Sequence, residues 1–234
     1  MTHRLPNALR AFATLLFLLP ALAYADRIAI IGTGDVGSAL GPEFAALGHE
    51  IVYGSRDPSR DTVAALVERT GNSASADTPA NAARNADIVV LAVPGRLAVE
   101  ITEGLGDLAG KIIIDPTNHY IRENPARLAA DISNGEAIQA AAPTAHVVKA
   151  FNTLNWRQMV DPDSSGGPVT IPLVGNDADA KATVAALVEG MGLEPIDVGP
   201  LKDARWGEGM LILWINNRYG SLRDSFDFHL RRTN

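Results

Sequence analysis

A glycine-rich loop is the part of the sequence whose residue types and spacing most directly suggest chemistry; it consists of Gly32, Thr33, Gly34, Asp35, Val36 and Gly37. It follows the apolar run 28–31 and opens a helical pattern. In this setting the first glycine permits a tight turn, the second lets the backbone approach a pyrophosphate, and the third lets the helix pack on the strand. Free amides and the positive end of the helix dipole would then face the pyrophosphate. The loop predicts a dinucleotide site; the alternative is a glycine-rich turn without a ligand.

The end of the next strand-like run, HEIVYGSR, indicates which dinucleotide is preferred. An NAD-specific site places an acidic residue about 20 residues beyond the loop, against the ribose hydroxyls. This chain instead has Ser55 and Arg56, and a hydroxyl with a guanidinium would bind the 2′-phosphate of NADP. Arg60 follows one helical turn later, either as a second ligand of that phosphate or as a solvated surface residue. The sequence therefore predicts NADP(H) as the cofactor.

Short β-branched runs alternate with longer alanine-rich segments along the rest of the chain. The runs are RIAIIG, HEIVYGS, ADIVVLAVP, KIIIDPTN, HVVKAFN, PVTIPLVG and LEPIDVG. Helices are expected at about 36–47, 61–70, 96–103, 135–142, 177–191 and 201–219. Because parallel neighbours require a crossover, this alternation predicts an α/β fold of the Rossmann type with a doubly wound, mainly parallel sheet. We expect a single domain over 26–234 with a C-terminal helix, and a surface loop at 161–168.

Composition excludes several classes of function. The chain has 234 residues, of which 47% are hydrophobic, and this suffices for one core. Its net charge is −7 without a stripe of Lys or Arg, so nucleic acid is not an expected partner. Cysteine is absent, which excludes disulfides, thiol nucleophiles and Cys-ligated metals. No HExxH pattern or Ser-His-Asp order appears, and we expect no metal site.

The first 25 residues have the composition of a signal peptide. Arg4 and Arg10 lie in a short acid-free region, residues 11–23 form an apolar run, and AYA at 23–25 offers small residues for cleavage. The apolar run is shorter than the roughly 20 residues that span a bilayer, which disfavours a retained anchor. We therefore expect cleavage after Ala25, no membrane span in the mature protein, and a periplasmic or secreted location. If the leader is not translated, the protein would be cytoplasmic.

Five longer segments carry a more specific signal than any one motif. They are IGTGDVGSALGPEFAALGHEIVYGSRDP, ADIVVLAVP, GKIIIDPTN, VVKAFNTL and VGNDADAKATVAALVEGMGLEPIDVGPLKDAR, and they lie within residues 27–205. In this combination the chain resembles the family of coenzyme F420-dependent NADP oxidoreductases, and is also similar to the NADPH-binding domain of the STEAP metalloreductases. The resemblance implies NADP(H) binding and hydride exchange with a flavin, a deazaflavin such as F420, or a ferric-flavin acceptor.

The resemblance also implies roles for residues in loops that follow strands, where a doubly wound sheet binds ligands. By position, the pyrophosphate would be lined by Thr33, Gly34, Asp35 and Val36, and the 2′-phosphate would be held by Ser55 and Arg56. The path toward the nicotinamide would be lined by Ala92, Val93 and Pro94. The nicotinamide itself would be bordered by Ala150, Phe151 and Asn152. Core packing is an equal alternative for Phe151.

Hydride transfer between two cofactor rings requires orientation and exclusion of water more than side-chain chemistry. The lack of an acid/base dyad is consistent with such a reaction. Asn118 and His119 follow the run KIIID at the edge where a ligand would lie. His119 is a candidate proton donor or acceptor contact, against the alternative of a surface loop histidine. Lys149 is a candidate general acid of an imine or 2-oxo acid reductase, although pairing with a nearby carboxylate explains it better.

The last predicted helix carries an apolar stripe of Trp206, Met210, Leu213 and Trp214. A core face or a homodimer face explains the stripe better than a flavin site. In the tail beyond this helix, Arg223, Arg231 and Arg232 are candidates for contact with an anionic acceptor, or simply exposed residues.

Two rival functions stay open at this point. A pyrroline-carboxylate or hydroxyacid reductase would share the first half of the chain but needs a large helical second domain, and only 31 residues follow Asp203. A non-catalytic NADP-binding module is the other rival, and export would favour it because NADPH is expected to be scarce outside the cytoplasm. We expect the protein to act on a small-molecule electron acceptor.

Overall fold

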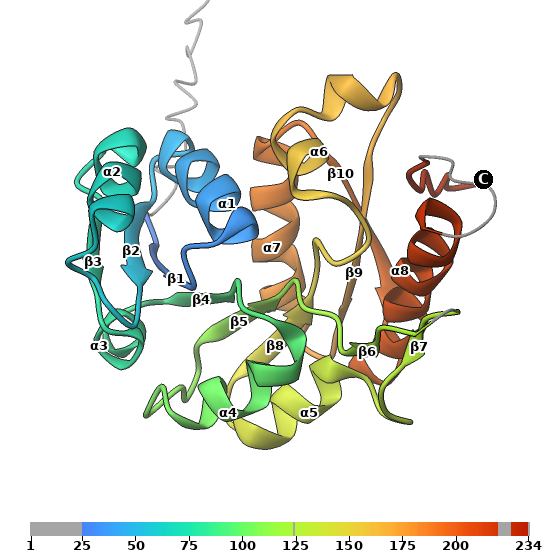
Figure 1. The fold of residues 1–234 in the computed structure, drawn as a ribbon, viewed down its shortest axis with the longest axis horizontal. Coiled ribbons are helices and arrows are strands. Elements are labelled where there is room, and N and C mark those ends of the chain that lie inside the picture. The colour runs from blue at the N-terminus through green and yellow to red at the C-terminus, as the bar shows by residue number, and fades with distance from the viewer. Residues whose placement is uncertain (1–24, 124, 220–225, 234) are drawn as a thin grey trace, which may run out of the picture.

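The computed structural model describes residues 25–123, 125–219 and 226–233 (Figure 1). The predicted signal peptide at 1–25 lies almost wholly outside the described residues, and so does Arg223 of the tail. Eight strands form one sheet in the order β10-β9-β8-β5-β4-β1-β2-β3. The strands are β1 (Arg27–Ile31), β2 (Glu50–Gly54), β3 (Ser75–Asp77), β4 (Ile88–Leu91), β5 (Ile112–Asp115), β8 (His146–Lys149), β9 (Thr170–Gly175) and β10 (Glu194–Gly199). A separate hairpin pairs β6 (Tyr120–Ile121) with β7 (Arg127–Leu128).

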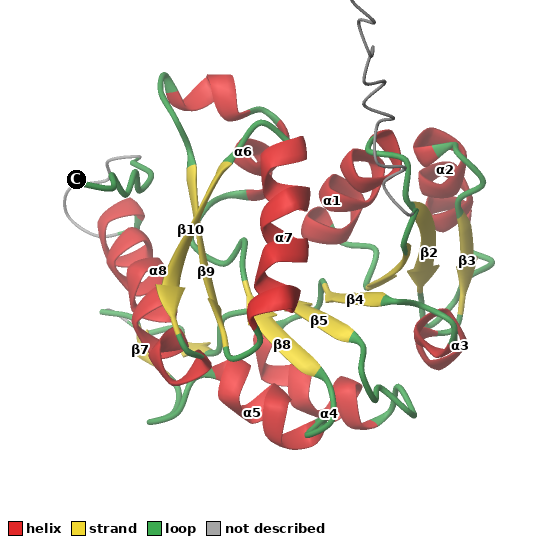
Figure 2. Cartoon of the chain, turned by 180° about the vertical axis from the view of Figure 1, so that it is seen from behind, coloured by secondary structure: helices red, strands yellow, loops and turns green. Residues whose placement is uncertain are grey.

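Helices connect the strands and cover both faces of the sheet (Figure 2). They are α1 (Asp35–Ala46), α2 (Asp61–Thr70), α3 (Pro79–Arg84), α4 (Ala98–Glu103), α5 (Asn134–Ala141), α6 (Trp156–Val160), α7 (Ala178–Gly190) and α8 (Ala204–Arg218). Three short 3₁₀ segments are η1 (Gly95–Leu97), η2 (Pro162–Ser165) and η3 (Leu201–Asp203).

Side chains that alternate along a strand pack into two separate hydrophobic cores, one on each face of the sheet. Ile28 and Ile30 of β1 belong to a core shared with α1, α2, α6 and α7. Ala29 and Ile31 belong to the core on the opposite face, with α3, α4 and α5. The side chains of residues 28–31 are all at most 1% exposed, as expected for a strand covered on both faces. The doubly wound α/β fold predicted from the sequence is confirmed.

The sheet is parallel from β3 to β8, but β9 and β10 run in the opposite direction. Val148 pairs with Gly175 and Lys149 with Val174 in an antiparallel register. The connection from β8 to β9 contains only the five-residue helix α6 and the short η2, and does not cross the sheet, so β9 starts at the edge where β8 ends. The longer helix α7 then crosses back, and β10 pairs with β9 in parallel. Hence the sheet is mainly rather than wholly parallel.

The predicted helices are present, with boundaries adjusted by local capping. Helix α5 starts one residue early because the Ser133 hydroxyl accepts from the Glu136 amide while Glu136 accepts from the Ser133 amide, a capping box. Asp177 caps α7, accepting a 2.8 Å hydrogen bond from the Ala180 amide. Helices α3 and α6, strand β3 and the β6–β7 hairpin had no predicted counterpart, because short segments carry too little periodicity to be recognised.

Helix α8 lies at the side of the molecule, next to α5, β7 and β9 (Figure 1). Of its residues only Ala204 and Glu208 are buried, whereas Trp206 is 71% and Leu213 58% exposed. A core face is therefore the wrong explanation for Trp206 and Leu213. No helix in the described part of the chain is both long and apolar enough to cross a membrane.

Candidate functional site

The glycine loop lies where β1 meets β4 at the carboxyl edge of the sheet, and its three glycines face different surroundings. Gly32 has φ +105°, and a Cβ there would overlap the Ala92 carbonyl oxygen. A Cβ on Gly37 would overlap the Gly32 carbonyl oxygen. By contrast, a Cβ on Gly34 would meet nothing within 4 Å. Two glycines are thus required for packing, and the third leaves the open approach that a pyrophosphate needs.

Helix α1 starts directly behind this opening. Its N-cap is Gly34, and no side chain accepts a hydrogen bond from the first turn. The helix is 12 residues long, so its dipole and its first amides offer a site of positive potential to an anion. This end of α1 fits the dinucleotide site expected from the sequence.

The loop after β2 carries two exposed arginines, and one of them contacts the glycine loop. Arg56 and Arg60 are both exposed, and Arg60 Nη2 donates a 3.2 Å hydrogen bond to Thr33 Oγ1. Ser55, in contrast, is only 3% exposed, and its hydroxyl donates to the carbonyl oxygen of Asp57 at 3.0 Å. Arg60 thus contacts the glycine loop, whereas the Ser55 side chain turns inward and shapes the turn that carries Arg56.

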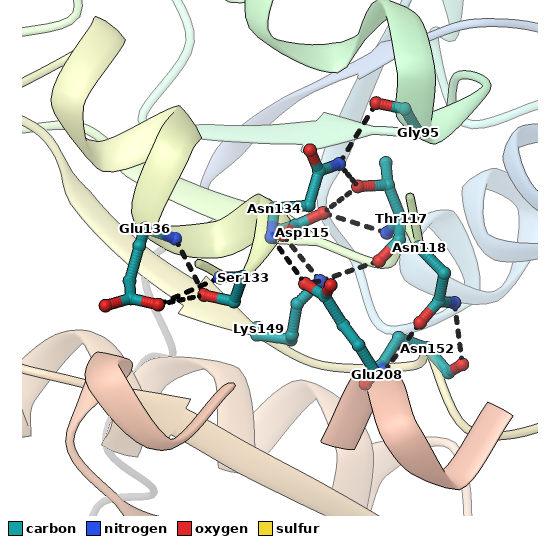
Figure 3. A network of polar contacts seen from close by, with 10 residues as sticks. All are labelled: Gly95, Asp115, Thr117, Asn118, Ser133, Asn134, Glu136, Lys149, Asn152 and Glu208. Atoms are coloured by element: carbon teal, nitrogen blue, oxygen red, sulfur yellow. Dashed lines mark hydrogen bonds and ion pairs between the residues drawn. The ribbon is translucent and has the colours of Figure 1, made fainter. Parts of the chain in front are cut away.

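The loops after β4, β5 and β8 converge on the same edge of the sheet. Ala92 packs on Gly32, and Gly95 lies so close to Asn118 that a Cβ would overlap the Asn118 carbonyl oxygen. Asn118 Nδ2 donates to the carbonyl oxygen of Asn152 at 2.9 Å, and Asn152 Nδ2 donates to Asn118 Oδ1 at 3.1 Å (Figure 3). Predicted residues from three separate loops are thus brought together. Val93 is half-buried and Pro94 is exposed along this path.

The turn after β8 is strained and places Phe151 in the core. Ala150 is fully buried and Phe151 is 1% exposed, with its ring 6.3 Å from that of Phe44 in an edge-to-face contact. Phe151 also has φ +63°, a left-handed conformation that a non-glycine residue adopts only where the surroundings impose it. The packing alternative therefore holds for the Phe151 side chain, and only its backbone borders the site.

Lys149 is the centre of a buried ionic cluster. Its Nζ lies 2.7 Å from Asp115 Oδ2, 2.6 Å from the carbonyl oxygen of Thr117 and 3.0 Å from Glu208 Oε1 (Figure 3). Lys149 is 0% exposed, and each of its three protons has an acceptor. The alternative that the sequence favoured for Lys149, pairing with carboxylates, is therefore confirmed, and in this structure its ammonium group has no exposed surface.

Further hydrogen bonds extend the cluster to neighbouring loops. Asp115 Oδ1 accepts from the amide of Thr117 at 2.8 Å and from its hydroxyl at 2.6 Å. The amide of Asn134 donates to Glu208 Oε1 at 2.7 Å, and Asn134 Nδ2 donates to the carbonyl oxygen of Gly95 at 3.1 Å. Burial raises the pKa of Glu208 and so does the negative charge of Asp115, against the opposing effect of Lys149.

Sequence reasoning missed Asp115, Thr117, Asn134 and Glu208 as parts of the site. A signal for Glu208 was present, since it is the one acidic residue within the apolar sequence WGEGMLILW. An acid on the buried face of a helix requires a partner. Which partner it finds depends on packing between α8 and strand ends far away in the sequence.

The remaining candidates lie in two places, His119 next to Asn118 and the tail arginines near β9. His119 is half-buried at the start of the hairpin, and its carbonyl oxygen accepts from the Ala129 amide at 3.1 Å. Arg231 and Arg232 are exposed beside a hollow of about 570 Å³ near the start of β9. Within the described residues no group of three or more His, Cys, Asp or Glu is arranged to hold a metal ion.

Together, the doubly wound sheet, the open glycine loop at its switch point and the two arginines beyond β2 define the chain as an NADP(H)-dependent oxidoreductase of the Rossmann type. Residues 27–119 match the family described as NADP oxidoreductase, coenzyme F420-dependent. The F420-dependent NADP reductase of Methanothermobacter thermautotrophicus is 32% identical over 81% of this chain and 88% of its own length. The chain therefore belongs to the F420-dependent NADP oxidoreductase family.

Two further relatives agree with this assignment. Metalloreductase STEAP3 of Rattus norvegicus is 30% identical over 77% of this chain, which spans about a third of that protein, 35% of its length. The crystal structure of a candidate F420-dependent NADP-reductase from Arthrobacter sp. FB24 superposes with a TM-score of 0.79 and 34% identity, covering 89% of this chain and 100% of that one. The fold expected from the family is thus the fold observed.

Proposed function

We propose that the protein transfers hydride between NADPH and a planar flavin-type acceptor, either a flavin, a deazaflavin of the F420 kind or a ferric flavin. The main support for this proposal is that the buried charged groups next to the Asn118–Asn152 pair are all paired with one another. Lys149 and the carboxylates of Asp115 and Glu208 bind one another and are at most 2% exposed. Such a site can orient and desolvate rings but offers no free acid or base from this cluster.

The proposed cofactor is NADPH, which supplies the hydride from its nicotinamide ring when bound. Arg56 and Arg60 would hold the 2′-phosphate, the amides at the start of α1 the pyrophosphate, and the Asn118–Asn152 pair the nicotinamide end. His119 stays a candidate for proton exchange with the acceptor.

The first turn of α8 supports a planar acceptor at this end. A Cβ on Gly207 would lie 3.8 Å from both amide atoms of Asn152, so this turn borders the amide pair. The neighbouring Trp206 is 71% exposed, and a tryptophan face is a suitable surface for stacking a flavin-type ring. The stacking face would exclude water from one side of the acceptor.

Turnover assays decide between this enzyme and a non-catalytic NADP-binding module. NADPH oxidation is measured with F420, FAD, FMN and ferric-flavin mixtures, with NADH as the control. We expect multiple turnovers with at least one of these acceptors and much slower reaction with NADH. Stoichiometric NADPH binding without oxidation across the whole panel would instead establish the binding module.

We also propose that residues 1–25 are a signal peptide and that the mature protein is periplasmic or secreted. The support is the basic, apolar and small-residue order of these residues. The intact mass of the protein recovered after export should correspond to a chain that starts at Asp26. Recovery of a chain that retains residues 1–25 would contradict the cleavage and favour an anchor or a cytoplasmic location.

Helix α8 is in addition the proposed homodimer face. Leu213 and Tyr219 are 58% and 67% exposed, and Trp214 packs its ring 6.2 Å from that of Tyr219. Sedimentation of the wild type should show a dimer, and Leu213→Glu should shift it toward the monomer. A matched Leu47→Glu substitution, at an apolar residue that is 37% exposed beyond α1, should leave the dimer intact. Sedimentation of the wild type as a monomer would refute the proposed homodimer.

A further inference from the structure

The cluster around Lys149 contains one positive and two negative groups in a region without water contact. Lys149 and Asp115 are 0% exposed and Glu208 is 2% exposed. Asp115 and Glu208 both lie within 3.0 Å of the Lys149 ammonium. With both carboxylates ionised, the cluster carries one net negative charge in surroundings that screen it poorly.

This charge lies at the end of the sheet where we place the nicotinamide. Asp115 and Lys149 are the last residues of β5 and β8 and pair with each other in the sheet. The loops that follow them carry Asn118 and Asn152, which bind each other through their amides. Figure 3 shows Glu208 entering from α8 between the strand ends and the amide pair.

We propose that Glu208 is a positioning residue whose charge sets the relative affinity of this site for oxidised and reduced nucleotide. The inference rests on the proposed nicotinamide position. The oxidised nicotinamide ring carries a positive charge, whereas the reduced ring is neutral. A buried negative charge at this end of the site therefore favours the oxidised form and makes bound NADPH a stronger hydride donor.

Glu208 is the member of the cluster whose charge can be changed with least disturbance. Asp115 also receives two hydrogen bonds from Thr117, and Lys149 contacts three acceptors. Glu208 accepts hydrogen bonds from Asn134 and Lys149 through a single oxygen, Oε1. Glutamine retains an acceptor oxygen of the same shape while removing the negative charge. The charged groups that face Glu208 are Lys149 from β8 and Asp115 from β5, and α5 contributes the uncharged Asn134.

The test compares the dissociation constants of NADP⁺ and NADPH for purified full-length wild type, Glu208→Gln, Glu208→Asp and Glu103→Gln. Glu103 is an exposed acid on α4, so its variant makes the same change in net charge at the surface. For Glu208→Gln we expect the ratio of the NADP⁺ to the NADPH constant to rise about four- to tenfold, the effect of one charge over roughly 12–20 Å at an effective dielectric constant of about 20. The two controls should keep the wild-type ratio.

Equal weakening of both forms by Glu208→Gln would overturn the proposal and leave Glu208 as an anchor of α8. If that variant fails to fold, the pH dependence of the wild type decides. As Glu208 ionises with rising pH, the ratio of the NADP⁺ to the NADPH constant should fall, and ionisation of the 2′-phosphate cancels because both forms carry it. A ratio that stays constant from below pH 4.5, the usual pKa of a glutamate, up to about pH 9 would refute the inference. The dissociation constants are measured without an electron acceptor. Absence of turnover would therefore refute the proposed function without affecting the result of this binding test.

Discussion

The two ends of the nucleotide site are built on opposite principles. At the proposed phosphate end, Gly32, Gly34 and Gly37 lie within six consecutive residues, and the backbone is open to solvent at Gly34. At the proposed nicotinamide end, Asp115, Lys149 and Glu208 come from β5, β8 and α8 and are buried. A site for the strongly solvated pyrophosphate needs access, whereas a site for hydride transfer would need to exclude water. The difference explains why one end forms a recognisable motif and the other does not.

The largest expected effect comes from leaving the buried carboxylates without their cation. Lys149→Met should lower the free energy of unfolding by about 3–5 kcal/mol, because Asp115 and Glu208 lose their shared partner. Urea unfolding measures the change. Lys202→Met, at an exposed lysine in η3, should change stability by less than about 0.5 kcal/mol. A similar small loss in both variants would mean that the cluster contributes little to the fold.

Filling the opening at Gly34 tests the phosphate end. Gly34→Ala places a methyl group in open space at φ −81°, a backbone angle that alanine adopts freely, so stability should change by less than about 1 kcal/mol. NADPH affinity should nevertheless fall at least about tenfold, because the methyl group occupies the approach of the pyrophosphate. Isothermal titration and thermal unfolding separate the two effects. Unchanged NADPH affinity would refute pyrophosphate binding at this loop.

Removing Arg56 tests cofactor choice at the same end. Arg56→Ala should weaken NADPH about tenfold or more and NADH hardly at all, because only NADPH carries the 2′-phosphate. Dissociation constants for both nucleotides measure the selectivity. Arg84→Ala, an exposed arginine in α3, is the matched control and should affect neither nucleotide. Equal loss of both nucleotides in Arg56→Ala would contradict the 2′-phosphate assignment.

The smallest effect concerns the pH dependence of stability at the nicotinamide end. The pKa of Glu208 is raised above its usual value of 4.5 because burial penalises the carboxylate. The folded protein thus binds a proton more tightly than the unfolded chain does, and this contribution is fully present below pH 4.5 and is lost as pH rises through the folded pKa. Urea midpoints should show a decline with pH in this window for the wild type. In Glu208→Gln the urea midpoint should decline less with pH. An unchanged slope of the midpoint against pH would show that Glu208 does not cause the decline.

Much of the fold could be predicted from local patterns. Apolar runs such as 28–31 and 88–91 identified the central strands, and the glycine spacing placed α1 behind the first of them. The direction of β9 could not be predicted, because it depends on whether the segment 150–169 crosses the sheet. The residues Ser55 and Phe151 were correctly located at the carboxyl edge, but both side chains turn inward, which no local pattern reports.

By itself the sequence determined the Rossmann fold, the glycine loop and the pair Ser55 and Arg56 that indicates NADP(H). These features are encoded by neighbouring residues, since the backbone of a short loop creates an anion site wherever a strand leads into a helix. Only the tertiary structure decided that Lys149 is enclosed by Asp115 and Glu208 rather than free for catalysis. The reason is physical: a buried charge takes its properties from the groups that surround it, and here they lie up to 93 positions apart along the chain, from Asp115 to Glu208.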